Sequence, residues 1–309
     1  MHDFLNDRNG FRGAWPALLT PLDAQLNIDH DRFAAHAQSL LAAGCGGVTL
    51  FGTTGEGPSF SVAERQEALL QMLARGVPAE RIIVSTSCAS AAETGVLTRH
   101  AVAQGVHGCL VLAPFFFQGV SDAGILACYD EVIAAVGHRD WRLYLYHIPQ
   151  VTGVGLSQAV IAALLQRYPG LVVGIKDSAC ERAHSVGLAQ AFMPPITVYV
   201  GNEPDLPTMG RLGSTGAISG LANFLPRVVT RLVLTPDAPG TAHDAARIDA
   251  ALDLVRPHVM IPAFKSIMAT LNQDPAWLRV RAPLVAMDAA THAAFSATIG
   301  AFAIDRARE

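Results

Sequence analysis

The sequence predicts an α/β fold, a (β/α)8 TIM barrel followed by a small C-terminal helical domain. Short apolar runs recur about every 28 residues, which is near the length of a strand–helix unit. Each run is apolar throughout, as expected for a strand that is covered on both faces. Segments with helix signals separate the runs, and eight such units in succession predict a closed parallel barrel.

The predicted strands follow one another in chain order. They are WPALLTP (15–21), GGVTLFG (46–52), RIIVSTS (81–87), GCLVLAP (108–114), LYLYHIP (143–149), LVVGIKD (171–177), TVYVGNE (197–203) and TGAISG (215–220). An open, doubly wound sheet is the structural alternative, and it would usually carry a G-x-G-x-x-G turn after its first strand. TPLDAQ (20–25) stands there instead, so the pattern favours the barrel.

Helix boundaries are marked between the runs. SVAE (61–64) and SAAE (90–93) fit the capping box, in which a serine and a glutamate satisfy free amides at a helix start. Gly44, Gly76 and Gly105 follow helical stretches, where a left-handed C-terminal cap favours glycine. These signals predict helices in the second half of each unit.

A proline- and glycine-rich break ends the segment 223–240, and the alanine-rich remainder shows no strand pattern. We therefore assign residues 1–238 to the barrel and residues 239–309 to a helical domain that we expect to serve oligomer contacts.

Composition argues against several classes of protein. The formal net charge is −4 and basic residues form no run, so a nucleic-acid partner is not expected. No apolar stretch reaches about 18 residues, and the polar N-terminus lacks an apolar signal core. We expect a cytoplasmic protein without a membrane partner.

Cysteine and histidine usage argues against metal and disulfide chemistry. The 5 cysteines are odd in number and include no C-x-x-C pair, and most stand in apolar surroundings typical of buried side chains. The 11 histidines show neither H-x-H nor H-E-x-x-H spacing. We therefore expect no metal and no other cofactor.

The active site of a TIM barrel lies at the C-terminal ends of its strands, so the polar and aromatic residues that close each run should share one rim. These residues are Thr20, Thr53, Thr54, Glu56, Ser85, Ser87, Phe115–Phe117, Tyr146, His147, Lys176, Asp177, Asn202, Glu203 and Ser219. A lysine, a tyrosine and a pair of threonines on one rim suit amine chemistry on a carbonyl compound.

Lys176 is conspicuous because the chain has 22 Lys and Arg residues, of which only Lys176 and Lys265 are lysines. Apolar walls disfavour a charged ammonium, and the neutral amine can attack a ketone to form a Schiff base. The protonated imine then stabilises a carbanion at the adjacent carbon, which permits carbon–carbon bond making or breaking without a metal. Arginine stays protonated and cannot do this. The alternative is a lysine that leaves the strand to meet solvent or Asp177.

The neighbouring rim residues also have two interpretations. Tyr146 could carry protons to and from the carbinolamine and the reacting hydroxyl, or it could be a core aromatic residue. Thr53 and Thr54 could bind a carboxylate, or they could shape a turn between glycines. Glu56 could tie loops together or take part in catalysis.

Four motifs in this order resemble the dihydrodipicolinate synthase / N-acetylneuraminate lyase family. They are GTTGE (52–56), YHIPQVTG (146–153), GIKDS (174–178) and GAISGLAN (216–223), and the similarity extends over roughly residues 10–300. The resemblance implies a TIM barrel with a C-terminal helical domain, usually a homotetramer. It also implies a class I aldolase or related lyase that binds pyruvate, or a pyruvyl group, as a Schiff base.

The resemblance further implies roles for matching positions. Lys176 resembles the Schiff-base lysine and Tyr146 the proton-transferring tyrosine. Thr53 and Thr54 match the pair that holds the pyruvate carboxylate. The remaining matches, Gly201 and Ile218, line the pyruvyl pocket.

Two departures concern the second substrate. The lysine-biosynthesis synthase of this family has an arginine that binds the distal carboxylate of its aldehyde, where this chain has Val151. A tyrosine that the synthase sends into a neighbouring subunit's site is replaced by Phe116, which has no hydroxyl. The variable end of the substrate is expected to contact the polar residues Asn202, Glu203 and Ser219. It is also expected to contact an aromatic wall formed by Phe115–Phe117, of which Phe116 is the middle residue.

The expected activity is therefore cleavage or formation of a 4-hydroxy-2-oxo acid, of the 2-keto-3-deoxy sugar acid type, to or from pyruvate and an aldehyde. Three alternatives remain open at this point. They are 4-hydroxy-tetrahydrodipicolinate synthase, which Val151 and Phe116 disfavour, a keto-deoxy acid dehydratase that uses the same imine, and a barrel that binds pyruvate without turnover.

Overall fold

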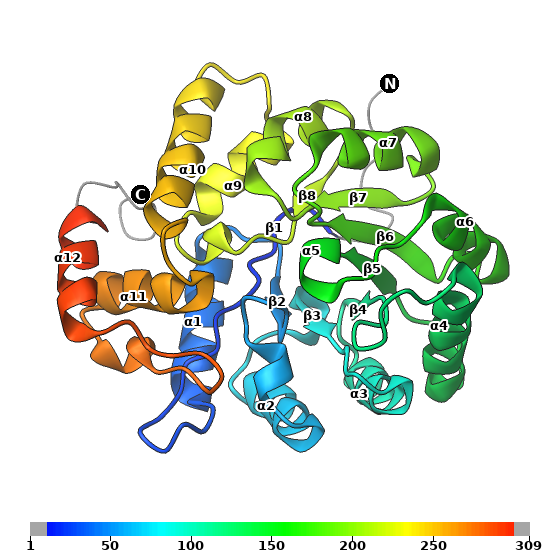
Figure 1. The fold of residues 1–309 in the computed structure, drawn as a ribbon, viewed down its shortest axis with the longest axis horizontal. Coiled ribbons are helices and arrows are strands. Elements are labelled where there is room, and N and C mark those ends of the chain that lie inside the picture. The colour runs from blue at the N-terminus through cyan, green and yellow to red at the C-terminus, as the bar shows by residue number, and fades with distance from the viewer. Residues whose placement is uncertain (1–10, 300–309) are drawn as a thin grey trace.

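The computed structural model describes residues 11–299 and confirms the predicted barrel. Eight parallel strands form one sheet in the order β1-β8-β7-β6-β5-β4-β3-β2. The ring is closed between the first two units, because the Thr49 amide donates to the Pro16 carbonyl (2.8 Å) and the Leu18 amide to the Thr49 carbonyl (2.9 Å). In Figure 1 the strands occupy the centre and helices surround them.

The strands lie within or next to the predicted apolar runs. Their bounds are β1 Gly13–Ala14, β2 Val48–Leu50, β3 Ile82–Ser85, β4 Gly108–Leu112, β5 Leu143–His147, β6 Val172–Asp177, β7 Thr197–Val200 and β8 Gly216–Ala217. The first strand is shorter and begins earlier than predicted. Pro16 has no amide hydrogen to donate to a neighbouring strand, and the regular strand ends before it.

Helices follow each strand and then form the C-terminal part. Their bounds are α1 His30–Ala42, α2 Val62–Ala74, α3 Ala91–Ala103, α4 Asp122–Val136, α5 Pro149–Thr152, α6 Gln158–Arg167, α7 Arg182–Phe192, α8 Leu206–Arg211, α9 Pro226–Leu234, α10 Thr241–Val255, α11 Met260–Asn272 and α12 Ala289–Ile299. Short 3-10 helices are η1 Gly57–Ser59, η2 Ala79–Arg81, η3 Glu203–Asp205, η4 Leu221–Asn223 and η5 Pro275–Leu278. No helix within residues 11–299 is long and apolar enough to span a bilayer.

The predicted helix signals act as expected. Ser61 and Glu64 form the full capping box at the start of α2, and the Ser90 hydroxyl accepts the Glu93 amide at the start of α3. The glycines after α1, α2 and α3 all have positive φ, as a left-handed cap requires; they are Gly44, Gly76 and Gly105.

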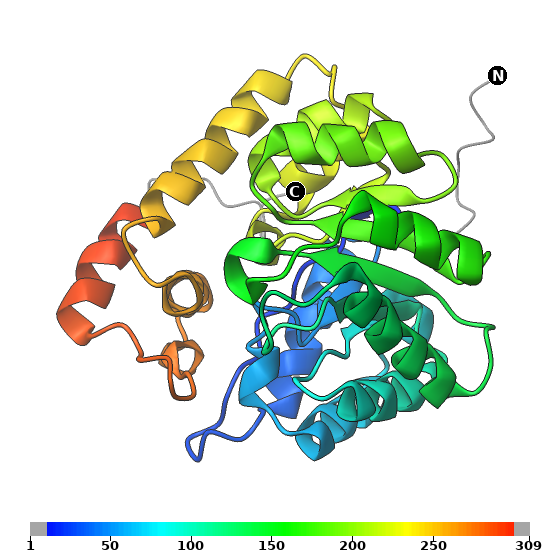
Figure 2. The same cartoon turned by 45° about the vertical axis from the view of Figure 1, so that its right-hand side comes forward.

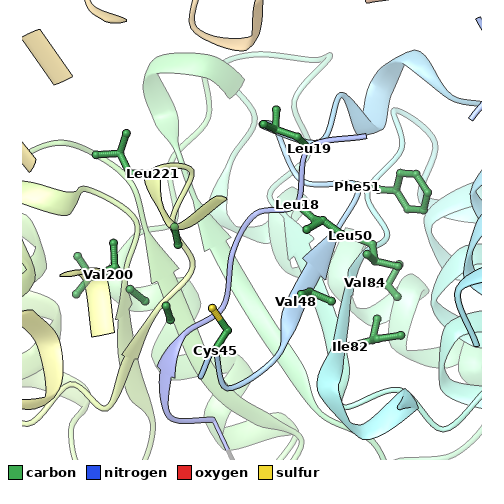
Figure 3. Close-up of a cluster of buried hydrophobic side chains, with 14 of the residues drawn as sticks. Leu18, Leu19, Cys45, Val48, Leu50, Phe51, Ile82, Val84, Val200 and Leu221 are labelled. Atoms are coloured by element: carbon green, nitrogen blue, oxygen red, sulfur yellow. The ribbon is translucent and has the colours of Figure 1, made fainter. Parts of the chain in front are cut away.

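One apolar layer lies inside the barrel, and a second lies between the strands and the helices. Alternate residues of β5 belong to different clusters: Leu143 and Leu145 pack in the outer layer, and Tyr144 and Tyr146 pack in the inner one. Figure 3 shows part of the outer layer, in which Val48 and Leu50 of β2 lie beside Ile82 and Val84 of β3. Because strand side chains alternate, a residue that faces the barrel interior is followed by one that faces the helices.

The C-terminal helices α10, α11 and α12 lie together on one side of the barrel, coloured yellow to red in Figures 1 and 2. The predicted boundary at residue 238 falls between α9 and α10. Arg281 joins this part to the barrel, because it forms an ion pair with Glu64 (2.7 Å) and donates to the Ser59 carbonyl (3.1 Å).

The Glu64–Arg281 contact should make stability depend on pH. The Arg281 hydrogen bond lowers the pKa of Glu64 from 4.5 to about 2. A carboxylate whose pKa is lowered in the folded state stabilises the protein above the unfolded pKa, and this contribution is lost as the pH falls toward the folded pKa. We expect Glu64→Gln to reduce the free energy of unfolding at about pH 6, with the difference from wild type shrinking as the pH falls below about 4.5. Denaturant unfolding across this range measures it. Glu67→Gln, at an exposed position on the same helix, is the control, and a constant Glu64→Gln difference at all pH values would contradict the expectation.

Candidate active site

Lys176 and Tyr146 meet inside the barrel, as the sequence predicts. They are register partners on β6 and β5. Lys176 Nζ donates a hydrogen bond of 3.1 Å to Tyr146 Oη and lies 4.2 Å from the centroid of the tyrosine ring. Both residues are buried, with 5% of Lys176 and 2% of Tyr146 exposed. A primary amine and a phenol are thus held together in an apolar interior, which corrects the alternative of a lysine that reaches solvent.

The turn after β2 brings the threonines to the same place. Thr53 Oγ1 lies 3.2 Å from Tyr146 Oη, within hydrogen-bond distance. Thr54 is buried in the same turn, next to Gly220 from the loop after β8. Lysine, tyrosine and threonine therefore form one connected chain of polar atoms contributed by β6, β5 and the turn after β2.

Gly201 and Ile218 also lie where the sequence places them. A Cβ atom at Gly201 would stand 3.0 Å from Lys176 Cε and 2.8 Å from the Asp177 carbonyl oxygen, so only glycine leaves room beside the lysine. Ile218 is buried in the same inner cluster as Tyr146. Gly201 thus borders the space around the amine, and Ile218 belongs to the apolar cluster in which Tyr146 packs.

Ser178 is a site residue that the sequence reasoning missed. Its hydroxyl is buried and has no hydrogen-bond partner among residues 11–299. A Cβ atom at Gly201 would lie 1.9 Å from Ser178 Oγ, so this oxygen and Lys176 Cε border the same small space. The signal was its spacing: two residues after Lys176, a strand-like chain places both side chains on one face.

Three residues that were expected to contact the substrate form hydrogen bonds with other groups of the protein instead. Glu203 accepts hydrogen bonds from the Ser219 hydroxyl (2.7 Å) and the Leu221 amide (3.2 Å). The side-chain amide of Asn202 donates a hydrogen bond of 2.8 Å to the Asp205 carboxylate. The Glu203 bonds join the loops after β7 and β8, and the Asn202 bond lies within the loop after β7. This hydrogen bonding of Asn202, Glu203 and Ser219 supports a structural role and does not support substrate contact.

The predicted aromatic wall is largely uncovered in the single chain. Phe116 and Phe117 are 69% and 72% exposed, and their rings contact each other edge to face at 5.2 Å. Val151 on α5 is 62% exposed. The contact of Phe116 with a substrate stays a prediction, since the chain alone shows this side chain at its surface.

His147 and Asp177 face the helices, opposite to Tyr146 and Lys176. The His147 ring stacks on His184 of α7 with centroids 4.4 Å apart, and its Nδ1 accepts the Leu156 amide (3.0 Å). The Asp177 carboxylate is hydrogen-bonded to the His184 ring (2.9 Å) and accepts a hydrogen bond from the Ser185 hydroxyl (2.6 Å). Burial lowers the pKa of His147, His184 acts in the same direction, and Asp177 opposes it. The cluster fixes the ends of β5 and β6 against α7.

The same cluster is the one group within residues 11–299 that could offer three metal ligands. The potential ligand atoms of His147, Asp177 and His184 lie within 4.8 Å of one another. The Nδ1 lone pair of His147 is used by a backbone amide, so a neutral ring carries its hydrogen on Nε2. This hydrogen bonding disfavours a metal here, and the expected absence of a metal stays a prediction.

Comparisons with known proteins identify the family of the chain. The signature of the Dihydrodipicolinate synthetase family matches residues 10–301. A relative from Chloroflexus aurantiacus, named an uncharacterized DapA-like lyase, is 34% identical over 278 residues, covering 89% of this chain and 91% of the relative.

Solved structures give the same result. The crystal structure of dihydrodipicolinate synthase from Agrobacterium tumefaciens is similar with a TM-score of 0.87 and 34% identity, over 94% of this chain and 99% of that one. YagE from Escherichia coli K12, a prophage protein of the dihydrodipicolinic acid synthase family in complex with pyruvate, is similar with a TM-score of 0.83 and 25% identity, over 94% and 98%.

Proposed function

The chain belongs to the dihydrodipicolinate synthetase family, and from that premise we propose that Lys176 forms a Schiff base with the carbonyl carbon of a 2-oxo acid. Lyases and aldolases of this family are pyruvate-dependent class I enzymes, so the chain is a lyase of that class. The substrate that we propose is a 4-hydroxy-2-oxo acid of the 2-keto-3-deoxy sugar acid type, which yields pyruvate and an aldehyde. The connected chain Lys176–Tyr146–Thr53 is the observation that carries the proposal.

The geometry supports a balanced sequence of steps. The Lys176 amine attacks C2 of the oxo acid, and the carbinolamine loses water to give a protonated imine. Tyr146, having given its proton to the departing water, takes the proton of the C4 hydroxyl while the C3–C4 bond breaks, and the bonding electrons move into the imine to give an enamine. The aldehyde leaves and Tyr146 passes the proton to C3 of the enamine. Water then releases pyruvate and the free amine, and the proton set free in this hydrolysis restores the Tyr146 phenol.

The threonine turn supports binding of the carboxylate. Hydroxyl groups and backbone amides are suitable donors to a carboxylate. Thr53 lies beside the phenol that would transfer the proton, so a carboxylate held by Thr53 and Thr54 would place C2 near Lys176. We therefore assign carboxylate binding to this pair, with Gly201 and Ile218 lining the pyruvyl pocket.

The second half of the substrate is proposed to be polar and without a carboxylate. The unpartnered Ser178 hydroxyl beside Lys176 can hydrogen-bond a substrate hydroxyl. Val151 offers no charge for a distal carboxylate. These two observations favour a hydroxylated aldehyde over the aldehyde of the synthase.

Synthase activity is the second candidate, because the Agrobacterium tumefaciens synthase is 34% identical over most of the chain. Val151 counts against it, since valine cannot replace a bidentate arginine. Dehydration of a keto-deoxy acid would use the same imine, and binding without turnover would leave Tyr146 without a purpose.

Further parts of the proposal come from the family resemblance. They are catalysis without a metal or other cofactor, assembly as a homotetramer and a cytoplasmic location. The exposed pair Phe116 and Phe117 supports assembly, because a surface pair of aromatic rings is often covered by a partner.

Trapping tests the proposal directly. Incubation with pyruvate and borohydride should add one reduced pyruvyl group to the peptide that contains Lys176, and a panel of keto-deoxy sugar acids should release pyruvate in the presence of a chelator. Peptide mass spectrometry and a coupled pyruvate assay are the measurements. A label on Lys265, or strong inhibition by the chelator, would overturn the mechanism, and condensation with an aldehyde that bears a distal carboxylate would select the synthase instead.

A further inference from the structure

We propose that Lys265 is a positioning residue for the active-site turn Thr53–Glu56, which it holds through a buried ion pair with Glu56. The inference rests on the proposed function, because it concerns the turn that would bind the pyruvyl carboxylate. It gives the second of the chain's two lysines a role that complements the first.

Lys265 reaches the barrel from outside it. The residue lies on α11, in the C-terminal part, and its side chain is 0% exposed. Its Nζ forms an ion pair with Glu56 Oε1 and donates a hydrogen bond of 2.7 Å to the Arg279 carbonyl oxygen. Burial lowers the pKa of Lys265, and the Glu56 carboxylate opposes this change. Removal of either partner would leave the other charge buried and uncompensated.

Glu56 has a backbone conformation that contacts with its surroundings must stabilise. Its φ is +56°, in the left-handed region that residues with side chains rarely adopt. Its amide donates to the Thr53 carbonyl at 3.1 Å, so Thr53 and Glu56 are the two ends of one turn. The Thr20 hydroxyl donates to the Gly55 carbonyl at 2.7 Å and supports the middle of the turn. Such a conformation persists where several contacts fix it together.

The turn therefore connects the two lysines. At one end, Thr53 lies 3.2 Å from Tyr146, which accepts the hydrogen bond from Lys176. At the other end, Glu56 meets Lys265. A shift of Glu56 would move Thr53 and Thr54 relative to the imine, so the ion pair should control how well the turn binds a carboxylate.

Lys265→Met tests this role, because methionine keeps most of the length of the side chain and removes the charge. We expect the pyruvate concentration for half-maximal borohydride labelling of Lys176 to rise by about tenfold or more, since small misplacements of binding groups are costly. The labelling yield at saturating pyruvate should stay close to that of wild type. Glu56→Gln should act in the same direction, and it provides the test if Lys265→Met does not fold. The double variant should recover part of the loss, because it removes both buried charges.

Ser266→Ala is the matched control. Ser266 is the next residue on α11 and hydrogen-bonds His292 of α12 at 2.6 Å, away from the turn. This variant should lower the melting temperature without changing the pyruvate dependence. An unchanged pyruvate dependence in both Lys265→Met and Glu56→Gln, or an equal change in Ser266→Ala, would overturn the inference. Absence of label on Lys176 in the wild type would instead refute the proposed function.

Discussion

Lys176→Met should abolish imine formation and lower lyase activity by about a thousandfold or more, because Lys265, the other lysine of the chain, is paired with Glu56. Methionine fills nearly the same volume, so the fold should be kept. The substitution also removes a buried amine whose hydrogen-bond partner within residues 11–299 is the Tyr146 hydroxyl. The melting temperature should therefore equal or exceed that of wild type, as expected where an active site is maintained at a cost to stability.

Three measurements on one preparation decide this result. They are the mass of the borohydride-treated protein, the rate of pyruvate release from the keto-deoxy acid panel, and the thermal unfolding curve. Lys265 is still present in this variant and serves as an internal control for unspecific labelling. Retained label together with retained turnover would show that Lys176 is not the nucleophile. A large loss of stability would show that the amine has a structural role that its single hydrogen bond does not reveal.

The barrel could be predicted because strand-length apolar runs with regular spacing leave few other folds. The bounds were less predictable. Within the run 15–21, Pro16 interrupts the regular strand. Closure of the ring depends on hydrogen bonds between this run and Thr49, a residue more distant in the sequence. The spacing of apolar runs indicates which segments are covered on both faces. The register of each strand in a closed sheet depends instead on the neighbouring strands with which it pairs.

The meeting of Lys176, Tyr146 and Thr53 could be predicted for a similar reason. Parallel strands end at one rim, so Tyr146 and Lys176 had to lie near each other. Glu203 and Ser219 stand at the same rim, but each satisfies the other's hydrogen bonding, and this cannot be read from their spacing. The position of Glu56 leaves both loop tying and catalysis open, and its ion pair with Lys265 joins the turn after β2 to helix α11. The partner itself could not be predicted, because it comes from a helix whose place beside the barrel is set by tertiary packing.

Tyr146→Phe should separate imine formation from bond cleavage. The ring remains in the inner cluster and beneath Lys176, so packing changes little. What is lost is the hydroxyl that bonds both Lys176 and Thr53. Loss of a general acid–base group lowers turnover by about 10²- to 10⁴-fold, so pyruvate release should fall by that factor. Labelling of Lys176 by pyruvate and borohydride should still reach completion when it is given time, because the amine is retained.

Thr53→Val is the matched variant for this prediction. It removes the hydroxyl next to Tyr146 and keeps a branched side chain of similar size. If the phenol transfers the proton and Thr53 holds the carboxylate, Thr53→Val should raise the half-saturating pyruvate concentration, and Tyr146→Phe should mainly lower turnover. The same pattern in both variants would mean that the two hydroxyls act as a single binding unit. Near-normal turnover in Tyr146→Phe would show that another group moves the proton, and the Ser178 hydroxyl, which borders the same space as Lys176, would then be the next position to substitute.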